Sequence, residues 1–216
     1  MKPKLIFFDL DGTLLDGLEY SWTLLWEYFG IPSELHRAPI KKYLAGTITY
    51  QEWVDYDVKL LQDHGATKAR ITAAFANIKP HLGAIECLEE LKKRGYKIFV
   101  ISGGVDFAVT IGLGEHERLI DEIFINKLYF DKAGQLTHAD ATPYDLEHKA
   151  TGIKEIAERH GVEPESCIFV GDNDNDVHAA LAAGASIAFN STSEPLIEAA
   201  THHIKTKDLR AILPLV

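Results

Sequence analysis

Cysteine is scarce in this chain of 216 residues, which contains only Cys87 and Cys167. The two lie far apart in apolar surroundings and form no Cys-x-x-Cys motif. Their number and spacing argue against a disulfide framework and against a metal or redox centre built on cysteine. We expect both to be reduced thiols in the core.

Long hydrophobic runs are also lacking. The apolar run after Lys4 reaches Asp9 after only four residues, which is too short for the apolar region of a signal peptide. No stretch approaches the roughly 18 consecutive apolar residues that a transmembrane helix needs. The sequence therefore predicts a cytoplasmic protein without a membrane partner.

Positive charge is in deficit, because 22 Lys and Arg residues face 32 Asp and Glu residues, for a formal net charge of −10. An acidic surface repels a phosphate backbone, so nucleic acid is a poor candidate partner. A small phosphorylated metabolite remains compatible with this charge, provided that a cation or a local basic group offsets the field. None of these features indicates an oligomeric state.

What the chain does contain is an ordinary globular composition, with 46% apolar and 25% charged residues. A run at 123–130 leads through Gly134 into a second run and predicts a hairpin. Other short apolar runs are bounded by Gly, Ser or Asp, and most are continuous, as in parallel strands covered on both faces. These predicted strands are KLIFF at 4–8, KIFVIS at 97–102, CIFVG at 167–171 and SIAF at 186–189.

Helical patterns separate the predicted strands, at 84–95, 148–161 and 176–184, and each pattern ends at a glycine. Strands that alternate with helices of this length are typical of an α/β fold with a doubly wound parallel sheet. Ligands of such sheets bind beyond the carboxyl ends of the strands. The residues at those ends are therefore the candidates for chemistry.

A helical segment interrupts this alternation between the first and second strands. It contains aromatic residues at helical spacing and a capping-box pattern at Thr49 and Glu52, and it has no convincing strand. We expect a small helical cap at 14–80, inserted into a core domain formed by 1–13 and 81–216.

Acidic and hydroxyl residues gather where the predicted strands end. Three separate features fall on the same edge of one sheet, and their coincidence is the main functional signal, because each alone is common. They are Asp9 and Asp11 after the first strand, Ser102, Gly103 and Gly104 after the second, and GDNDND with Asp172, Asp174 and Asp176 after the CIFV strand, with Lys149 near the start of a helix.

This set is sufficient for the hydrolysis of a phosphate ester. Carboxylates on one edge repel one another unless a cation joins them, and Asp9 and Asp172 can supply the carboxylate pair that Mg²⁺ uses. Such a carboxylate can attack phosphorus, and Asp11 can protonate the leaving oxygen and then activate water. Ser102 can donate to the phosphoryl oxygens, and Lys149 can neutralise their charge.

The motifs FDLDGT, ISGG, a lysine and GDNDND resemble those of the haloacid dehalogenase superfamily, in order and over nearly the whole chain. LKKRGYKIFVISGG and KDLRAIL are most similar to its phosphoserine phosphatase-like branch. The resemblance implies a Rossmann-like core with a helical cap. The second aspartate of the first motif, Asp11, is absent from the dehalogenases and points to a phosphatase.

The resemblance also assigns roles to individual residues. It implies that Asp9 is the nucleophile and Asp11 the general acid and base. Mg²⁺ would be held by Asp9, Asp172 and the backbone carbonyl of Asp11, and Asp176 would act through a water molecule bound to the metal. The residues implied for the phosphoryl group are Ser102, Gly103, Lys149 and Asn175.

The cap departs from the pattern of phosphoserine phosphatases. In those enzymes a cap arginine binds the substrate carboxylate, and the corresponding position here holds Asp55. A second substrate-binding position, a glutamate, falls at Leu18, with Glu19 adjacent. An acid repels a carboxylate, so phosphoserine is a doubtful substrate unless Arg37 or Arg70 replaces the missing arginine.

The sequence thus predicts a Mg²⁺-dependent phosphomonoesterase of a small metabolite, acting through an aspartyl-phosphate. Phosphoserine phosphatase itself is the alternative with the same chemistry, and a phosphomutase is a further one. From another class, a phosphate- or metal-binding regulator with an acidic pocket remains open, although such domains have no helical insertion of this size and need no acid such as Asp11.

Overall fold

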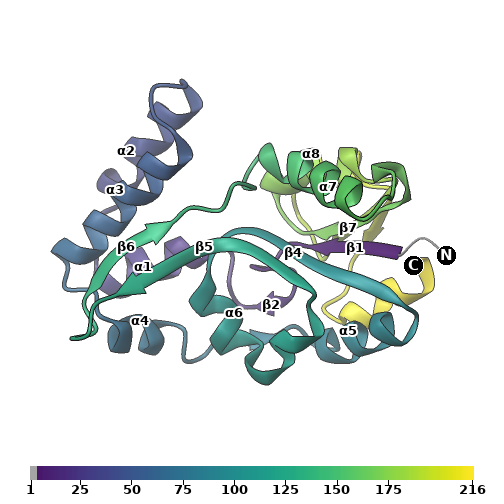
Figure 1. Ribbon diagram of the computed structural model, residues 1–216, viewed down its shortest axis with the longest axis horizontal. Helices are drawn as coiled ribbons and strands as arrows, with labels where there is room; N and C mark the ends of the chain where they lie inside the picture. Colours follow the sequence, from purple (N-terminus) through teal and green to yellow (C-terminus); the bar gives the residue numbers. More distant parts are fainter. Residues whose placement is uncertain (1–3) are drawn as a thin grey trace.

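The computed structural model describes residues 4–216, and within them the six predicted strands and one further strand, β9, form a seven-stranded sheet (Figure 1). All neighbouring strands are parallel except the antiparallel pair β5 and β6. The predicted α/β fold is therefore confirmed. In spatial order the strands are β6 (Leu136–Asp140), β5 (Glu122–Phe130), β4 (Tyr96–Val105), β1 (Lys4–Phe8), β7 (Ile168–Gly171), β8 (Ala185–Phe189) and β9 (His202–Ile204).

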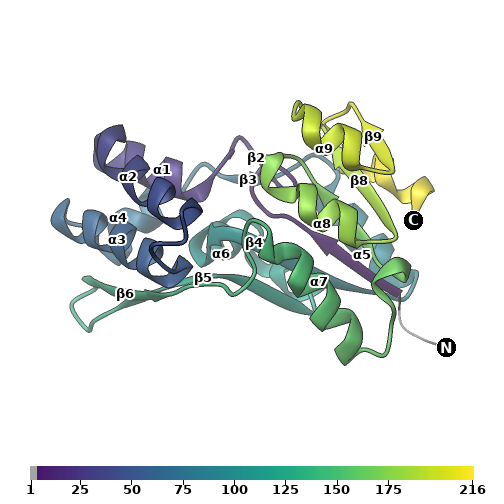
Figure 2. The same cartoon turned by 90° about the horizontal axis from the view of Figure 1, so that it is seen from above.

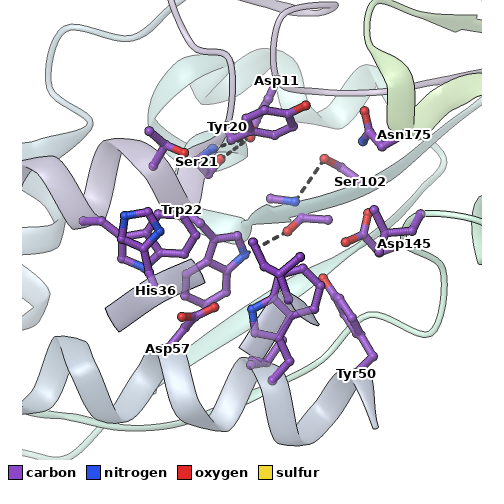
Figure 3. Close-up of a pocket in the computed structure, with 18 of the residues that line it drawn as sticks. Asp11, Tyr20, Ser21, Trp22, His36, Tyr50, Asp57, Ser102, Asp145 and Asn175 are labelled. Atoms are coloured by element: carbon purple, nitrogen blue, oxygen red, sulfur yellow. Dashed lines mark hydrogen bonds between the residues drawn. The ribbon is translucent and has the colours of Figure 1, made fainter. Parts of the chain in front are cut away.

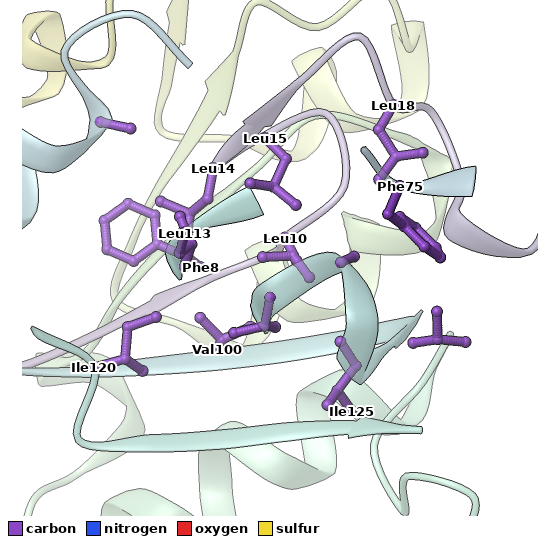
Figure 4. Close-up of a cluster of buried hydrophobic side chains, with 14 of the residues drawn as sticks. Phe8, Leu10, Leu14, Leu15, Leu18, Phe75, Val100, Leu113, Ile120 and Ile125 are labelled. Carbon is purple, nitrogen blue, oxygen red and sulfur yellow. The ribbon is translucent and has the colours of Figure 1, made fainter. Parts of the chain in front are cut away.

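The first strand lies at the centre of the sheet, which explains its continuous apolar sequence. It pairs in parallel with β4 and β7, so that Phe8 is in register with Val100 on one side and Val170 on the other. Alternate side chains of β1 enter different cores, because successive residues of a strand point to opposite faces. The core that contains Phe8 is shown in Figure 4.

Helices cover both faces of the sheet. The helices α5 (Ala84–Lys93) and α6 (Asp106–Gly112) pack with the core of Phe8. The opposite core, which contains Phe7, is closed by α7 (His148–Arg159), α8 (Val177–Ala182) and α9 (Glu194–Ala199). Short 3₁₀ helices occupy connections at Gly114–Leu119, Pro164–Ser166 and Asp174–Asp176, and a further one, Leu209–Leu215, follows the last strand.

The helical cap lies between β1 and the second core strand of the chain, as predicted (Figures 1 and 2). The chain enters the cap through β2 (Leu15–Asp16) and leaves it through β3 (Lys79–Pro80), and these two strands pair antiparallel. This pair supports limits near 14 and 80, and the exact division into two domains stays a prediction. The cap helices are α1 (Ser21–Phe29), α2 (Ser33–Leu44), α3 (Tyr50–Asp63) and α4 (Lys68–Ala74).

The cap helix α3 begins at the predicted capping box of Thr49 and Glu52. The same helix is tied to the β5–β6 hairpin. The side-chain amide of Gln62 donates to the carbonyls of Leu136 and Thr137 at 3.0 and 2.8 Å, and Gln51 donates to that of Ala139 at 3.0 Å. The hairpin therefore extends beyond the core to lie against the cap (Figure 2).

The two cysteines are free and buried, as expected. Within residues 4–216, each helix is too short or too polar to span a lipid bilayer.

Candidate active site

The residues at the carboxyl ends of β1, β4 and β7 meet at one place, because β4 and β7 flank β1 in the sheet. Asp9 and Asp11 follow β1, Ser102 lies in β4, and Asp172 and Asp176 follow β7. The side chains that the sequence placed on one sheet edge are thus close in space. Figure 3 shows the cavity that Asp9, Asp11 and Ser102 line.

Three carboxylates form an acidic cluster at this edge. Oxygen atoms of Asp9, Asp172 and Asp176 all lie within 4.8 Å of one another. Burial, followed by the charges of neighbouring acids, raises the pKa of Asp172, and burial raises that of Asp176 even though Lys149 opposes the shift. A set of hard oxygen donors that repel one another fits a divalent cation such as Mg²⁺.

Lys149 is buried next to the acidic cluster, at the start of α7. Its ammonium Nζ lies 2.9 Å from Asp9 Oδ1 and 2.7 Å from Asp176 Oδ1. Burial by itself lowers the pKa of this lysine, but the carboxylates of Asp176 and Asp9 outweigh it and hold the pKa above its usual range. The residue is therefore a fixed positive charge at the site, not a surface lysine.

Asp11 is turned toward the cap instead of the acidic cluster. One of its oxygens, Oδ2, accepts hydrogen bonds from the backbone N–H and the hydroxyl of Ser21, both at 2.6 Å. Burial, and then the charge of Asp9, raise the pKa of Asp11 to about 7. A carboxyl with that pKa can both give and take a proton near neutral pH.

Glycines at the strand ends allow the backbone to approach these acids closely. Gly12 has a positive φ of 76°, and a Cβ there would lie 2.2 Å from Asp172 Oδ2. A Cβ on Gly103 would lie 2.2 Å from Asp145 Oδ2. The SGG segment is not the turn that its composition suggests, because β4 continues through it to Val105.

The cavity beside the acids has a volume of about 500 Å³. Its core end is lined by Asp9, Asp11, Ser102, Gly103 and Asn175, so most of the predicted phosphate contacts face it. Its cap end is lined largely by aromatic side chains of α1 and α3. The indole N–H of Trp22 donates to the carbonyl of Gly103 at 2.9 Å. This hydrogen bond connects the cap helix α1 to β4 of the core.

Two polar residues of the site escape prediction from sequence. Asn126 is fully buried in β5 and donates to the carbonyls of Gly103 and Gly104 at 2.7 and 3.0 Å. Its signal is a lone amide within an apolar strand. Asp145 lines the cavity next to Gly103, and burial raises its pKa. Its segment has no pattern that marks it.

The polar residues Asn173 and Asp174 of GDNDND form hydrogen bonds with nearby protein groups. The side chain of Asn173 accepts from the backbone N–H of Asp174 at 2.8 Å, and the carboxylate of Asp174 accepts from the hydroxyl of Ser193. Asp176 Oδ2 accepts the backbone N–H groups of Asp172 and Asn173, at 2.9 and 3.2 Å. Asp174 is therefore directed away from the acidic cluster.

The predicted specificity residues of the cap do not line the cavity. Asp55 is exposed and accepts a hydrogen bond from Gln51, and Glu19 is also exposed. On α3 the side chains that line the cavity are those of residues 50, 53, 54 and 57, which leaves 55 on the outer face of the helix. Arg37 lines the cavity, whereas Arg70 binds the carbonyls of residues 64 and 65.

Comparison with known sequences places the chain among hydrolases. Residues 3–184 match the family model of the haloacid dehalogenase-like hydrolases. Over its full length the chain is 34% identical to a phosphoserine phosphatase of Methanocaldococcus jannaschii, 98% of which is covered. It is 32% identical to the phosphoserine phosphatase of Wolinella succinogenes, with 97% of this chain and 98% of that protein aligned.

Solved structures give the same result. A phosphoserine phosphatase captured as an analogue of its phospho-aspartyl intermediate has a TM-score of 0.78 to this chain, with 31% identity and full coverage of both. A substrate-bound phosphoserine phosphatase complex has the same TM-score and identity, and 99% of it is covered. The α/β sheet with a helical cap after β1 is the fold of those structures.

Proposed function

This chain belongs to the haloacid dehalogenase-like hydrolase family, in its phosphoserine phosphatase-like branch, and from that premise we propose a Mg²⁺-dependent phosphomonoesterase that hydrolyses a small phosphorylated metabolite through an aspartyl-phosphate. The observation that carries the proposal is the position of Asp9. Its carboxylate belongs to the acidic cluster, lies 2.9 Å from Lys149 Nζ and lines the cavity.

The reaction has two steps. A carboxylate oxygen of Asp9 attacks phosphorus, the bond from phosphorus to the leaving oxygen breaks, and Asp11 gives that oxygen its proton. Asp11 then takes a proton from water, whose oxygen attacks the same phosphorus and releases Asp9 and inorganic phosphate. The raised pKa of Asp11 suits it to both transfers.

The remaining residues hold the transferring group. Ser102, Gly103 and Asn175 line the core end of the cavity. Their hydroxyl, backbone N–H and side-chain amide are the donors proposed for the phosphoryl oxygens. Lys149 supplies the compensating positive charge. Bound Mg²⁺, held by Asp9, Asp172 and the backbone carbonyl of Asp11 with Asp176 acting through metal-bound water, would neutralise charge on the phosphoryl oxygens.

Turnover of p-nitrophenyl phosphate tests this proposal. We expect release of p-nitrophenol with MgCl₂, loss of the activity after EDTA treatment and its return when Mg²⁺ is added back. A phosphate- or metal-binding regulator would bind phosphate or metal without turnover. No Mg²⁺-dependent turnover of any phosphomonoester in a metabolite screen would contradict the enzyme proposal.

Replacing Asp11 with asparagine should slow turnover by about 10²–10⁴-fold, the usual contribution of a general acid and base. The amide keeps the shape of the side chain and cannot exchange the proton. The measurement is kcat as a function of pH, where the limb that reports Asp11 should disappear. Asp16→Asn, an exposed site nearby, is the control and should retain activity. Full activity of Asp11→Asn would remove Asp11 from this role.

Mg²⁺ should stabilise the folded chain, and more strongly at pH 8 than at pH 5. Folding raises the pKa of Asp172 and of Asp176. The metal-free protein therefore loses stability as the pH rises through the pKa values that these two residues have in the folded state. Mg²⁺ binds the ionised forms and offsets this loss, by about 2.7 kcal/mol at a concentration 100 times its Kd. Thermal unfolding with MgCl₂, and with KCl at equal ionic strength, measures the effect. If Mg²⁺ raised the unfolding temperature of Asp172→Asn as much as that of the native protein, the assigned metal site would be contradicted.

Phosphoserine phosphatase is the second candidate. Its support is the identity to relatives of that name and the position of Arg37, a cation in the cavity that could receive a substrate carboxylate. It requires strong turnover of L-phosphoserine. The cytoplasmic location expected from the sequence remains a prediction under either candidate.

A further inference from the structure

The cap end of the cavity is walled by aromatic rings. Trp22 and Trp26 of α1 have ring centroids 6.5 Å apart, and on α3 the rings of Tyr50 and Trp53 meet edge to face at 5.8 Å. All four line the cavity. The faces of such rings carry partial negative charge and attract cations, most strongly when water is excluded.

Asp57 is the acid at this end of the cavity. Figure 3 shows it on the cap side, away from Asp11 and Ser102. Its side chain is 3% exposed, and within residues 4–216 its Oδ1 accepts no hydrogen bond and no basic side chain forms a salt bridge with it. The Trp53 side chain is a hydrogen-bonding neighbour of Asp57, and it brings no positive charge. A buried carboxyl without a cationic partner costs free energy, and a ligand with a positive charge would offset that cost. Burial raises the pKa of Asp57 to about 8.

The charges that line the cavity favour a cationic group over an anionic one. Asp9, Asp11, Asp57 and Asp145 all face it, and Arg37 is the only lysine or arginine of residues 4–216 in its lining. Arg37 is exposed, so solvent screens its charge. An anionic group beside Asp57 would raise the pKa of this carboxyl further and leave it without an ion pair. A cationic group would favour the ionised form of Asp57 and pair with it.

We propose that the alcohol released by this enzyme carries a positively charged nitrogen and no carboxylate, and that this nitrogen sits against Asp57 between the aromatic rings of the cap. The substrate class is the phosphate monoester of an amino alcohol, with a primary or quaternary ammonium group. The inference rests on the proposed function, because it places the phosphoryl end of the same molecule at Asp9.

A pair of isosteric esters tests the charge directly on the native enzyme. Choline phosphate and 3,3-dimethylbutyl phosphate have the same shape and the same phosphate, and differ in that a quaternary nitrogen replaces a carbon. We expect kcat/KM to be about 10- to 100-fold higher for choline phosphate, since each tenfold corresponds to about 1.4 kcal/mol. Equal values for the two esters would overturn the inference.

Ethanolamine phosphate and L-phosphoserine test the exclusion of a carboxylate, because they differ by that group. The inference expects the higher kcat/KM for ethanolamine phosphate. A preference for L-phosphoserine would overturn it in favour of an anion site at Arg37.

Asp57→Asn tests the residue. The amide keeps the shape and removes the charge, so the preference for choline phosphate over its neutral isostere should fall toward one, mainly through a higher KM for choline phosphate. Asp63→Asn, an exposed acid on the same helix, is the matched control and should keep the preference. An unchanged preference in Asp57→Asn, with its thermal unfolding unaltered, would overturn the assignment.

Hydrolysis of p-nitrophenyl phosphate separates the two possible failures. Its leaving group carries no cation, so the proposed function predicts its turnover whatever the role of Asp57. A chain that hydrolyses it and does not discriminate between the isosteric esters would overturn this inference alone. A chain that hydrolyses none of these esters with Mg²⁺ would overturn both.

Discussion

Asp9→Asn should abolish turnover, lowering kcat for p-nitrophenyl phosphate by about 10⁴-fold or more, as loss of a nucleophile does in enzymes that form covalent intermediates. The amide fills the same space at the end of β1 and does not attack phosphorus. Acid quench during turnover should trap a phosphorylated chain from the native protein and none from the variant. The measurements are steady-state kcat and the mass of the quenched protein.

The variant must remain folded for this result to be informative. Its backbone N–H still donates to Val170 at 2.9 Å, which continues the pairing of β1 and β7. We therefore expect cooperative thermal unfolding like that of the native protein. Native turnover by a folded Asp9→Asn variant, or a phosphorylated chain trapped from it, would remove Asp9 from the nucleophile's role.

Lys149→Met should lower the free energy of unfolding by about 3–5 kcal/mol, the usual cost of removing one partner from a buried ion pair. The substitution keeps an unbranched side chain and leaves the carboxylates of Asp9 and Asp176 buried without their common cation. Activity should be lost with it. Urea denaturation at pH 7, with and without MgCl₂, measures the change in stability.

Two comparisons isolate the charge. Lys154→Met, an exposed position on the same helix, should leave stability nearly unchanged. Lowering the pH to about 5 should recover part of the stability of Lys149→Met, because the unpaired acids can then take up protons. A loss equal to that of Lys154→Met would show that the ion pairs contribute nothing measurable.

The core of the fold is predictable from sequence because its strands are covered on both faces. After Lys4, the residues of KLIFF alternate between two different cores, so each of the four positions from Leu5 to Phe8 is apolar. The strand ends follow from the same reasoning, since parallel strands bring their carboxyl ends to one edge. The sequence alone therefore predicts that Asp9, Asp11 and Asp172 lie together.

The cap resists this reasoning for two reasons. Helix α2 contains Pro39 and buries few side chains, so its apolar pattern in the sequence is weak. In α3 the sequence does not show which side of the helix faces the cavity, because successive residues of an α-helix are rotated by about 100°. Asp55 and Asp57 are two positions apart and thus lie on nearly opposite faces. The packing of α3 against β6, α2 and α1 determines which of them faces the cavity.

The bonds from Gln51 and Gln62 to the β5–β6 hairpin have a mechanical consequence. Two side-chain amides of α3 donate to three backbone carbonyls of β6, those of Leu136, Thr137 and Ala139. A displacement of α3 away from the cavity must break these hydrogen bonds or bend the β5–β6 hairpin with the helix. Because β5 of this hairpin pairs with β4, such bending would also act on β4, the strand that carries Ser102. The hairpin therefore couples movement of the cap helix α3 mechanically to the core sheet.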